Sequence, residues 1–132
     1  MIMNELCVLV FMILCHLIDD YVLQGWLATG KQKEWWRKQD NYDEMYKNDY
    51  KMALACHGLE WSIITHIPVI VFRSFYVDLY LFLMIITMAY CHSIIDDCKA
   101  NKKGINLVQD QLCHLLQIAW SWFFLAVLKL VW

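Results

Sequence analysis

Charge is scarce in this sequence, and neither sign dominates. Only 18% of the 132 residues are charged, and the formal net charge is −2. Proteins that bind nucleic acid present a strongly basic surface, so nucleic acid is not an expected partner. The six cysteines include no C-x-x-C pair and show no regular spacing, which argues against a disulfide framework and against a zinc ribbon.

Several catalytic and targeting motifs are missing as well. The chain has no Ser-His-Asp order and no glycine loop that would cradle a phosphate, so triad and P-loop mechanisms have no support. Glu5 stands where a signal peptide would carry basic residues, and no small-residue cleavage site follows the apolar start. We therefore expect Met1–Gln24 to be retained as a span.

Apolar residues, in contrast, are abundant. They make up 61% of the chain, against roughly 45–50% in soluble globular domains. A single domain of 132 residues could not bury so much apolar surface, because small domains leave a large share of their area in water. We predict an integral membrane protein, with a soluble helical bundle or half of a tight oligomer as the alternative.

Four apolar stretches, with their flanks, reach or nearly reach the roughly 20 residues that cross a bilayer. They predict spans at about 3–24, 52–72, 77–98 and 106–132, in an all-α integral membrane four-helix bundle that forms one domain over residues 1–132. The segment 25–51 between the first two spans is polar and rich in Trp and Tyr, which suits the headgroup layer. We expect it to hold an interfacial helical segment.

The distribution of lysine and arginine predicts the orientation. Segment 25–51 and the connection after the third span carry nine Lys or Arg residues, whereas the opposite side carries two, Arg73 and Lys129. The positive-inside rule therefore places these two segments in the cytoplasm and both termini outside. The expected location is the inner (cytoplasmic) membrane, as a multi-pass protein within the lipid bilayer.

Each span carries a histidine near its cytoplasmic end, and on three spans an aspartate lies four residues away. Residues at this spacing share one stripe of a helix. Because the helices alternate in direction, the four histidines should lie within about two turns of the same membrane surface. The cluster comprises His16, Asp20 and Gln24 in the first span, His57 in the second, His92, Asp96 and Lys99 in the third, and Asp110, Gln111 and His114 in the fourth.

This cluster predicts either a metal centre or a structural polar network. An ionisable residue inside a bilayer costs about 2.5–3.5 kcal/mol on insertion scales, so these groups must satisfy one another or hold a cation. In the first interpretation one or two divalent ions (Zn, Mn or Fe) are held by His16, His57, His92, His114, Asp20 and Asp96. In the second, hydrogen bonds and ion pairs only hold the helices together. His66, half a turn round the helix from His57, should pack outside the cluster.

A cysteine directly precedes each clustered histidine, at Cys15, Cys56, Cys91 and Cys113. A thiolate-rich metal site would use both members of each pair, but neighbours on a helix diverge by about 100°. We therefore expect these cysteines to serve helix packing, as small residues do at membrane helix interfaces.

The polar residues form blocks in a fixed order. These are H-x-x-x-D-[FY]-x-x-Q from His16 to Gln24, Lys31, His57, H-x-x-x-D-x-x-K from His92 to Lys99, and D-Q-x-x-H from Asp110 to His114. In this order the sequence resembles an uncharacterised family of small bacterial and phage membrane proteins, a domain of unknown function. The resemblance implies a membrane bundle with this polar set and supplies no established activity. Asp19 stands where that pattern has glycine. More distantly, the chain looks like membrane-bound metal-dependent hydrolases with HxxxD pairs in apolar helices.

The leading functional hypothesis is a metal-dependent hydrolase of lipid or phosphoester substrates at the cytoplasmic interface. A bound metal lowers the pKa of its water toward about 7, and one of Asp20, Asp96 or Asp110 would be the general base. The expected substrate-binding residues, for an anionic lipid headgroup or a nucleotide, are Gln24, Lys31, Lys99 and Gln111. The first alternative is an ion or proton pathway formed by a homo-oligomer. The second is a non-catalytic membrane interaction module with a structural polar core.

Overall fold

The computed structural model describes residues 4–39 and 44–127, and within these ranges the regular elements are all helical. The first helix, α1 (Glu5–Ile18), continues into a π-helical turn, η1 (Asp19–Leu23), and three short elements follow: α2 (Leu27–Gly30), α3 (Lys33–Arg37) and η2 (Glu44–Tyr46). The later elements are α4 (Asp49–Phe72), α5 (Leu79–Ala100), α6 (Leu107–Trp122) and a second π-helical segment, η3 (Phe123–Val127). The all-α prediction is confirmed.

Three helical stretches are long and apolar enough to cross a membrane: Glu5–Leu23, Glu44–Phe72 and Leu79–Ala100. They cover the first three predicted spans. The fourth predicted span, 106–132, forms α6 and η3 as far as residue 127, and its remainder lies outside the described residues. Three membrane-length helices are therefore a property of the fold, and the four-span bundle stays a prediction.

The predicted interfacial segment 25–51 folds into short helices and not into one long helix. It contains α2, α3 and η2, its residues 40–43 lie outside the described part of the chain, and its last three residues already belong to α4. Trp26, Trp35 and Trp36 pack edge to face, with ring centroids 5.0–6.0 Å apart. Such a group of rings is typical of the layer between lipid and water.

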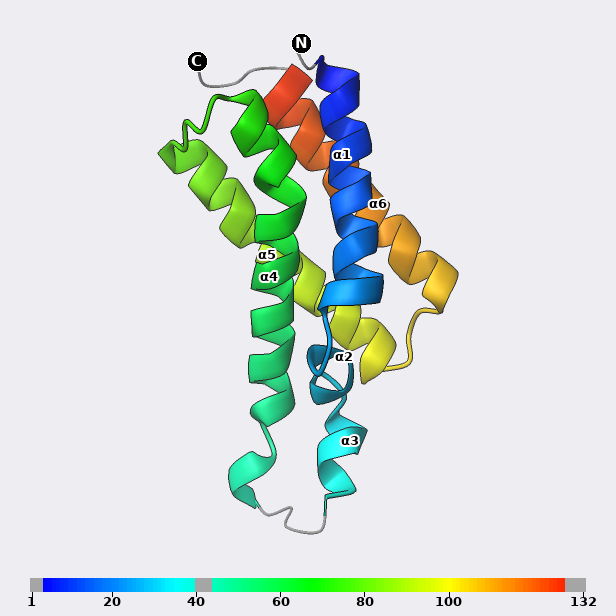
Figure 1. Cartoon of the computed structure of the whole chain (residues 1–132). Coiled ribbons are helices and arrows are strands. Elements are labelled where there is room, and N and C mark those ends of the chain that lie inside the picture. The colour runs from blue at the N-terminus through cyan, green and yellow to red at the C-terminus, as the bar shows by residue number, and fades with distance from the viewer. Residues whose placement is uncertain (1–3, 40–43, 128–132) are drawn as a thin grey trace.

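Figure 1 shows how the long helices are arranged. α1 and α4 run side by side, and α5 and α6 cross them at a steep tilt. The start of α1, the turn between α4 and α5, and the far end of α6 gather at one end of the molecule, whereas α2 and α3 extend from the other. The His and Asp residues lie between these two ends, at the level where all four long helices meet.

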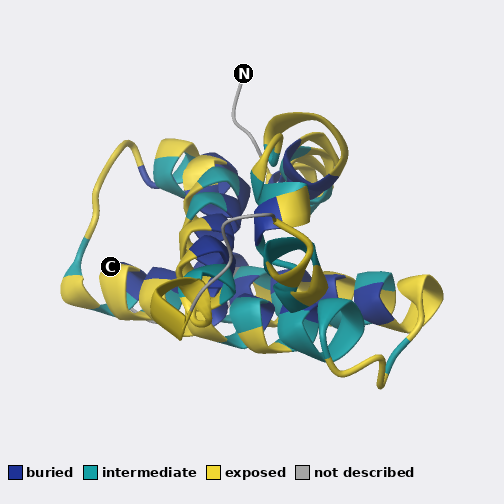
Figure 2. Ribbon diagram, turned by 90° about the horizontal axis from the view of Figure 1, so that it is seen from below, coloured by how far each residue is buried: buried dark blue, intermediate teal, exposed yellow. Residues whose placement is uncertain are grey.

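The long helices expose many apolar side chains, and the interior contains a buried polar cluster beside its apolar core. Exposed side chains on the long helices include Leu6, Val10, Leu14, Ile63, Leu83 and Leu116, whereas the interior holds five histidines and several aspartates. Figure 2 shows the buried stripes of the helices facing one another and the exposed stripes facing outward. A soluble protein has its charged groups outside, so this distribution supports membrane association.

α4 and α5 pack closely at the level of the histidines. Gly58 makes the approach possible, since a Cβ there would lie 2.5 Å from Ala89 O and closer still to Ser93 Oγ. The Ser93 hydroxyl also donates a hydrogen bond to a backbone carbonyl of α4, 3.0 Å away. Gly58 directly follows His57 and Ser93 directly follows His92, so the close contact brings these two imidazoles together.

A capping box begins α6. The Asn106 side chain accepts a hydrogen bond from the Gln109 N–H, and the Gln109 side chain accepts one from the Asn106 N–H, each over 3.0 Å. This reciprocal pairing satisfies two N–H groups at the helix end and fixes where the helix starts. Asp110 and His114, one turn apart on α6, are thereby both directed into the interior.

Candidate metal centre

The structure brings the predicted polar residues of four long helices together at one level. The histidines and aspartates of this set are buried, and so is Asp19, whereas Gln24, Lys99 and Gln111 are partly exposed. The cluster is made of His16 at the end of α1, Asp19 and Asp20 on η1, His57 on α4, His92 and Asp96 on α5, and Asp110 and His114 on α6.

The π-helical turn η1 places two neighbouring aspartates in the interior. Adjacent residues of a regular α-helix diverge by about 100°, so one of the two would normally point outward. A π-turn inserts an extra residue into the helical repeat, and such turns are frequent at functional sites. Asp19 Oδ2 lies 3.9 Å from His57 Nδ1. The helical spacing does not predict that Asp19 belongs to the cluster. The one indication in the sequence is that a second carboxylate at this depth in the membrane requires a partner.

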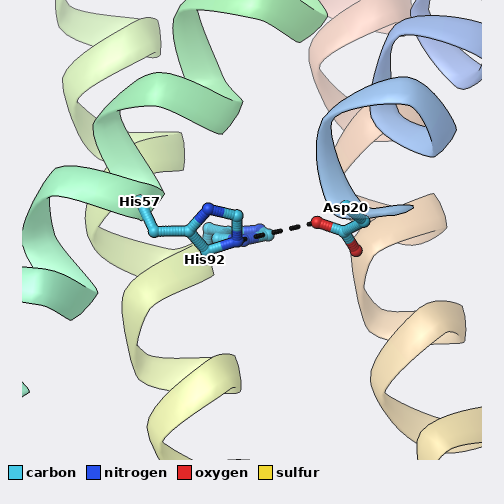
Figure 3. A group of neighbouring side chains, drawn as sticks. All are labelled: Asp20, His57 and His92. Carbon is cyan, nitrogen blue, oxygen red and sulfur yellow. Dashed lines mark hydrogen bonds and ion pairs between the residues drawn. The ribbon is translucent and has the colours of Figure 1, made fainter. Parts of the chain in front are cut away.

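Asp20, His57 and His92 form the first group that can hold a metal ion. His57 Nε2 lies 3.3 Å from His92 Nε2 and 3.7 Å from Asp20 Oδ1. In Figure 3 the two imidazoles point from α4 and α5 toward Asp20 on η1. Zinc bonds of about 2.0–2.1 Å in a tetrahedral site place neighbouring ligand atoms roughly 3.3–3.4 Å apart, so small shifts would close this group around an ion.

His92, Asp96 and His114 form the second group. His114 Nε2 lies 3.5 Å from Asp96 Oδ1 and 3.5 Å from Asp110 Oδ1. The other oxygen of Asp96, Oδ2, lies 3.5 Å from His57 Nε2 and 3.8 Å from His92 Nε2. One carboxylate therefore faces three imidazoles.

Several buried atoms in these groups have no hydrogen-bond partner within the described part of the chain. They include Asp20 Oδ1, Asp110 Oδ1 and His114 Nε2. A buried polar atom without a partner costs about 1–3 kcal/mol, which a bound cation would offset. Imidazole nitrogens combined with carboxylate oxygens suit Zn, Mn or Fe. The buried His and Asp residues can therefore hold a metal ion.

His16 lies beside the two groups and is hydrogen-bonded at both ring nitrogens. Trp61 Nε1 donates to its Nδ1 over 2.8 Å, and its Nε2 lies 3.1 Å from Gln111 Oε1. The Gln111 amide also donates to Asp20 Oδ2 over 3.2 Å and to Asp110 Oδ2 over 3.3 Å. His16 was predicted to be a metal ligand, but both of its ring nitrogens form hydrogen bonds with residues that surround the two ion groups. Gln111, predicted to bind substrate, belongs to the same hydrogen-bond network.

Trp61 is a site residue that the sequence pattern does not single out. Its ring stacks on His92 at a centroid distance of 4.2 Å, and His92 stacks in turn on His114 at 4.1 Å. Trp61 follows His57 by four residues on α4, so helical spacing is the signal that places it on the polar face. The indole closes the cluster on the side of the apolar core formed by Val8, Met12, Ile85 and Ile118.

Two lysines reach the cluster from the opposite side. Lys31 Nζ lies 2.6 Å from Asp96 Oδ2, and Lys99 Nζ lies 2.6 Å from Asp110 Oδ2. Each ammonium group therefore contacts a carboxylate that also faces His114. Both lysines were predicted to bind substrate, and the structure gives them an aspartate partner in addition.

A cleft of about 320 Å³ opens next to these lysines. It is lined by Gln24, Ala28, Lys31, Gln32, Asp96, Lys99, Ala100 and Lys103. Three of the four predicted substrate-binding residues, Gln24, Lys31 and Lys99, thus lie at one opening. Asp96 connects this opening to both ion groups.

His66 lies outside the cluster, as its spacing predicts. Its ring is fully buried, and Nδ1 lies 2.7 Å from Ser62 O on the same helix. The four cysteines that precede the clustered histidines are half-buried or exposed, and neither ion group includes a cysteine among the described residues. Their role in helix packing stays a prediction, and Cys56 is exposed.

The fold and the cluster together define a class of protein: all-helical, with membrane-length helices and buried His and Asp groups that can hold a metal ion. Comparison of the chain with protein-family models, with curated proteins and with solved structures finds no match. The function is therefore inferred from the geometry of the site.

Proposed function

We propose that this chain is an inner-membrane metalloprotein that hydrolyses lipid or nucleotide-like phosphoesters at the cytoplasmic end of its helical bundle. The position of Asp96 carries the proposal. Its two oxygens face His57, His92 and His114 at 3.5–3.8 Å. These distances are too long for good hydrogen bonds and close to the spacing of ligand atoms around one ion.

Charge balance supports a divalent ion at this position. Four buried carboxylates contribute a formal −4 and two lysines contribute +2, which leaves −2; these are Asp19, Asp20, Asp96 and Asp110, with Lys31 and Lys99. Protonation of two histidines would also balance this charge. Imidazolium groups, however, draw carboxylates into hydrogen bonds of about 2.7–2.9 Å, whereas His114 Nε2 stands 3.5 Å from both Asp96 and Asp110.

The cleft gives this centre access to an anionic substrate. A divalent ion would supply a water of lowered pKa. A free carboxylate oxygen of Asp20, Asp96 or Asp110 would accept the proton from that water. Gln24, Lys31 and Lys99 would hold the phosphate at the cleft. Gln111, itself hydrogen-bonded to His16, would orient Asp20 and Asp110.

Metal content tests the proposal. Protein purified in detergent is expected to retain about one or two transition-metal ions per chain and to lose them to a chelator. His92→Ala should lose most of this metal, because His92 belongs to both ion groups. His66→Ala is the matched control, since it removes an equally buried histidine outside the cluster. Folded protein that carries no metal after reconstitution with Zn, Mn and Fe would refute the metal centre and leave a hydrogen-bonded polar core.

Turnover tests the hydrolase part separately. With metal bound, the protein should hydrolyse phosphoester bonds in phospholipid or nucleotide-like substrates, and Asp96→Ala should abolish the activity. Stoichiometric metal without turnover would exclude the hydrolase and leave a structural or transport site.

A proton or metal-ion pathway is the second candidate, and buried polar residues beyond the cluster favour it. Ser62, Thr65 and His66 follow His57 along α4 toward the turn at 73–78 and are fully buried. Buried ionisable groups inside membrane helices are typical of relays. Flux assays in liposomes distinguish the candidates: flux that His66→Ala abolishes would establish transport, and liposomes that stay tight would exclude it.

A further inference from the structure

Lys31 and Lys99 form ion pairs with carboxylate oxygens of Asp96 and Asp110, which a bound metal ion would need as ligands. We infer that these lysines are resident counter-ions that a divalent metal displaces, and that the displaced ammonium groups bind a phosphate-type oxyanion in the adjoining cleft. The inference rests on the proposed metal centre. Its consequence is that metal and oxyanion bind cooperatively at this end of the bundle.

The geometry of the two ion pairs carries the first step. Lys31 Nζ lies 2.6 Å from Asp96 Oδ2, the oxygen that also faces His57 Nε2 at 3.5 Å. Lys99 Nζ lies 2.6 Å from Asp110 Oδ2, while the other oxygen of Asp110 faces His114 at 3.5 Å. An ion bound between these carboxylates and imidazoles would stand within a few ångströms of each ammonium group. Like charges at such a distance repel strongly where water is excluded.

The cleft gives the ammonium groups a place to go. Lys31 and Lys99 both line it, together with Lys103 and Gln24. The Lys99 side chain is already 36% exposed and that of Lys31 14% exposed, so neither must cross the protein interior to reach the opening. Four-carbon stems let lysine ammonium groups move in this way. Once a metal engages Asp96 and Asp110, the cleft lining presents the ammonium groups of Lys31, Lys99 and Lys103 to a ligand.

A phosphate-type oxyanion is the ligand that this lining fits. Asp96 is the one carboxylate among the residues that line the cleft, and metal binding would neutralise it. Ammonium groups attract the phosphates of lipid headgroups as well as free phosphate. Because coupling of two binding sites is reciprocal, the metal must raise the affinity for the oxyanion by the same factor as the oxyanion raises the affinity for the metal.

Equilibrium binding of radiolabelled inorganic phosphate tests the inference, with detergent-purified full-length protein in chelator and in stoichiometric Zn²⁺. Zinc should raise the phosphate affinity by about 5- to 150-fold, the usual range of coupling between sites. Lys31→Met and Lys99→Met should lower phosphate affinity and leave zinc affinity unchanged or higher, because a competing cation has been removed. Lys102→Met is the matched control: Lys102 also pairs with an aspartate, Asp97 at 2.9 Å, but does not line the cleft.

Each other outcome has a defined meaning. Zinc binding without any change in phosphate affinity overturns the inference and leaves the metal centre standing, whereas folded protein that binds none of Zn, Mn and Fe overturns both. Zinc affinity that falls in Lys31→Met also overturns it, because the lysine would then support the ion. Nanodiscs identify the natural source: competition by phosphatidic acid, but not by phosphatidylcholine, indicates a lipid headgroup, and phosphate binding that neither lipid affects indicates a soluble phosphate.

Discussion

The two carboxylate oxygens of Asp96 have different surroundings. Oδ2 pairs with a lysine and also faces two imidazoles, and Oδ1 faces a third imidazole. The contacts of Asp96 are the ion pair with Lys31 at 2.6 Å and the approaches to His57, His92 and His114 at 3.5–3.8 Å. An asparagine of the same shape would replace one acceptor oxygen by a donor and remove the negative charge. Asp96→Asn therefore tests whether the cluster requires the negative charge of Asp96 or only a side chain of its shape.

Asp96→Asn is predicted to abolish most metal retention and to destabilise the protein. Removing one member of a buried ion pair costs about 3–5 kcal/mol, because the partner charge is left uncompensated. Metal analysis and denaturant unfolding in detergent measure the two effects, and Lys31→Met added to Asp96→Asn should restore part of the stability. The control is Asp97→Asn, because its partner Lys102 is exposed and surface ion pairs contribute little to stability. Equal effects at Asp96 and Asp97 would contradict the assignment.

Gln111 links three members of the cluster through one amide group. Gln111→Leu is predicted to cost about 1–3 kcal/mol, because it removes one hydrogen bond each from buried His16, Asp20 and Asp110. In a double-mutant cycle with His16→Ala the two changes should be non-additive, by about 0.5–3 kcal/mol, since they remove the same hydrogen bond. Additive unfolding free energies would show that the two residues do not share a network.

Spacing along single helices predicts part of this site. The i, i+4 pairs His92 with Asp96 and Asp110 with His114 face inward because residues one turn apart share a helix face. Asp19 escapes such a prediction, because its inward position depends on a π-turn that regular helical spacing does not include. The engagement of His16 with Trp61 likewise depends on how two distant helices pack.

At the scale of elements, the contact between α4 and α5 sets the distance between the ligand groups. The apolar runs predict that both helices exist, since each must cross about 30 Å of hydrocarbon. How closely they approach depends on Gly58 opposite Ala89 and Ser93, a pairing of residues 31 and 35 positions apart that no local pattern specifies.

Gly58→Ala is therefore predicted to push α4 and α5 apart. Its Cβ would lie 2.5 Å from the backbone oxygen of Ala89, which cannot move as a side chain can. Overpacking of this kind costs about 1–3 kcal/mol, and separation of His57 from His92 should weaken metal binding as well. Gly104→Ala is the control, since the nearest atom to its Cβ would be Cys98 O at 3.9 Å. Unchanged metal affinity in Gly58→Ala would show that this close contact does not position the ligands.

At the scale of the whole molecule, apolar side chains dominate the exposed faces of the long helices, a charged cluster is buried between them, and one end of the molecule differs from the other in charge. Nine of the eleven Lys and Arg residues belong to segment 25–51 and to segment 99–103 at the end of α5 and just after it, whereas Arg73 lies in the turn at the opposite end. By the positive-inside rule, this asymmetry predicts that the lysine-rich end faces the cytoplasm. The cleft with Lys31, Lys99 and Lys103 lies at the lysine-rich end, so orientation decides which compartment supplies its ligand.

The orientation is testable with single cysteines in a background whose native cysteines are replaced. Lys38→Cys and Lys103→Cys are predicted to react with a membrane-impermeant maleimide only after the cells are permeabilised, because both positions are exposed at the lysine-rich end. Ser74→Cys, exposed in the turn between α4 and α5, should react in intact cells and serves as the opposite-side control. Labelling of Lys38→Cys and Lys103→Cys from outside intact cells, with Ser74→Cys protected, would show that the protein has the opposite orientation in the membrane. The cleft would then draw its oxyanion from outside the cytoplasm, and a cytoplasmic lipid headgroup or nucleotide would be excluded as its ligand.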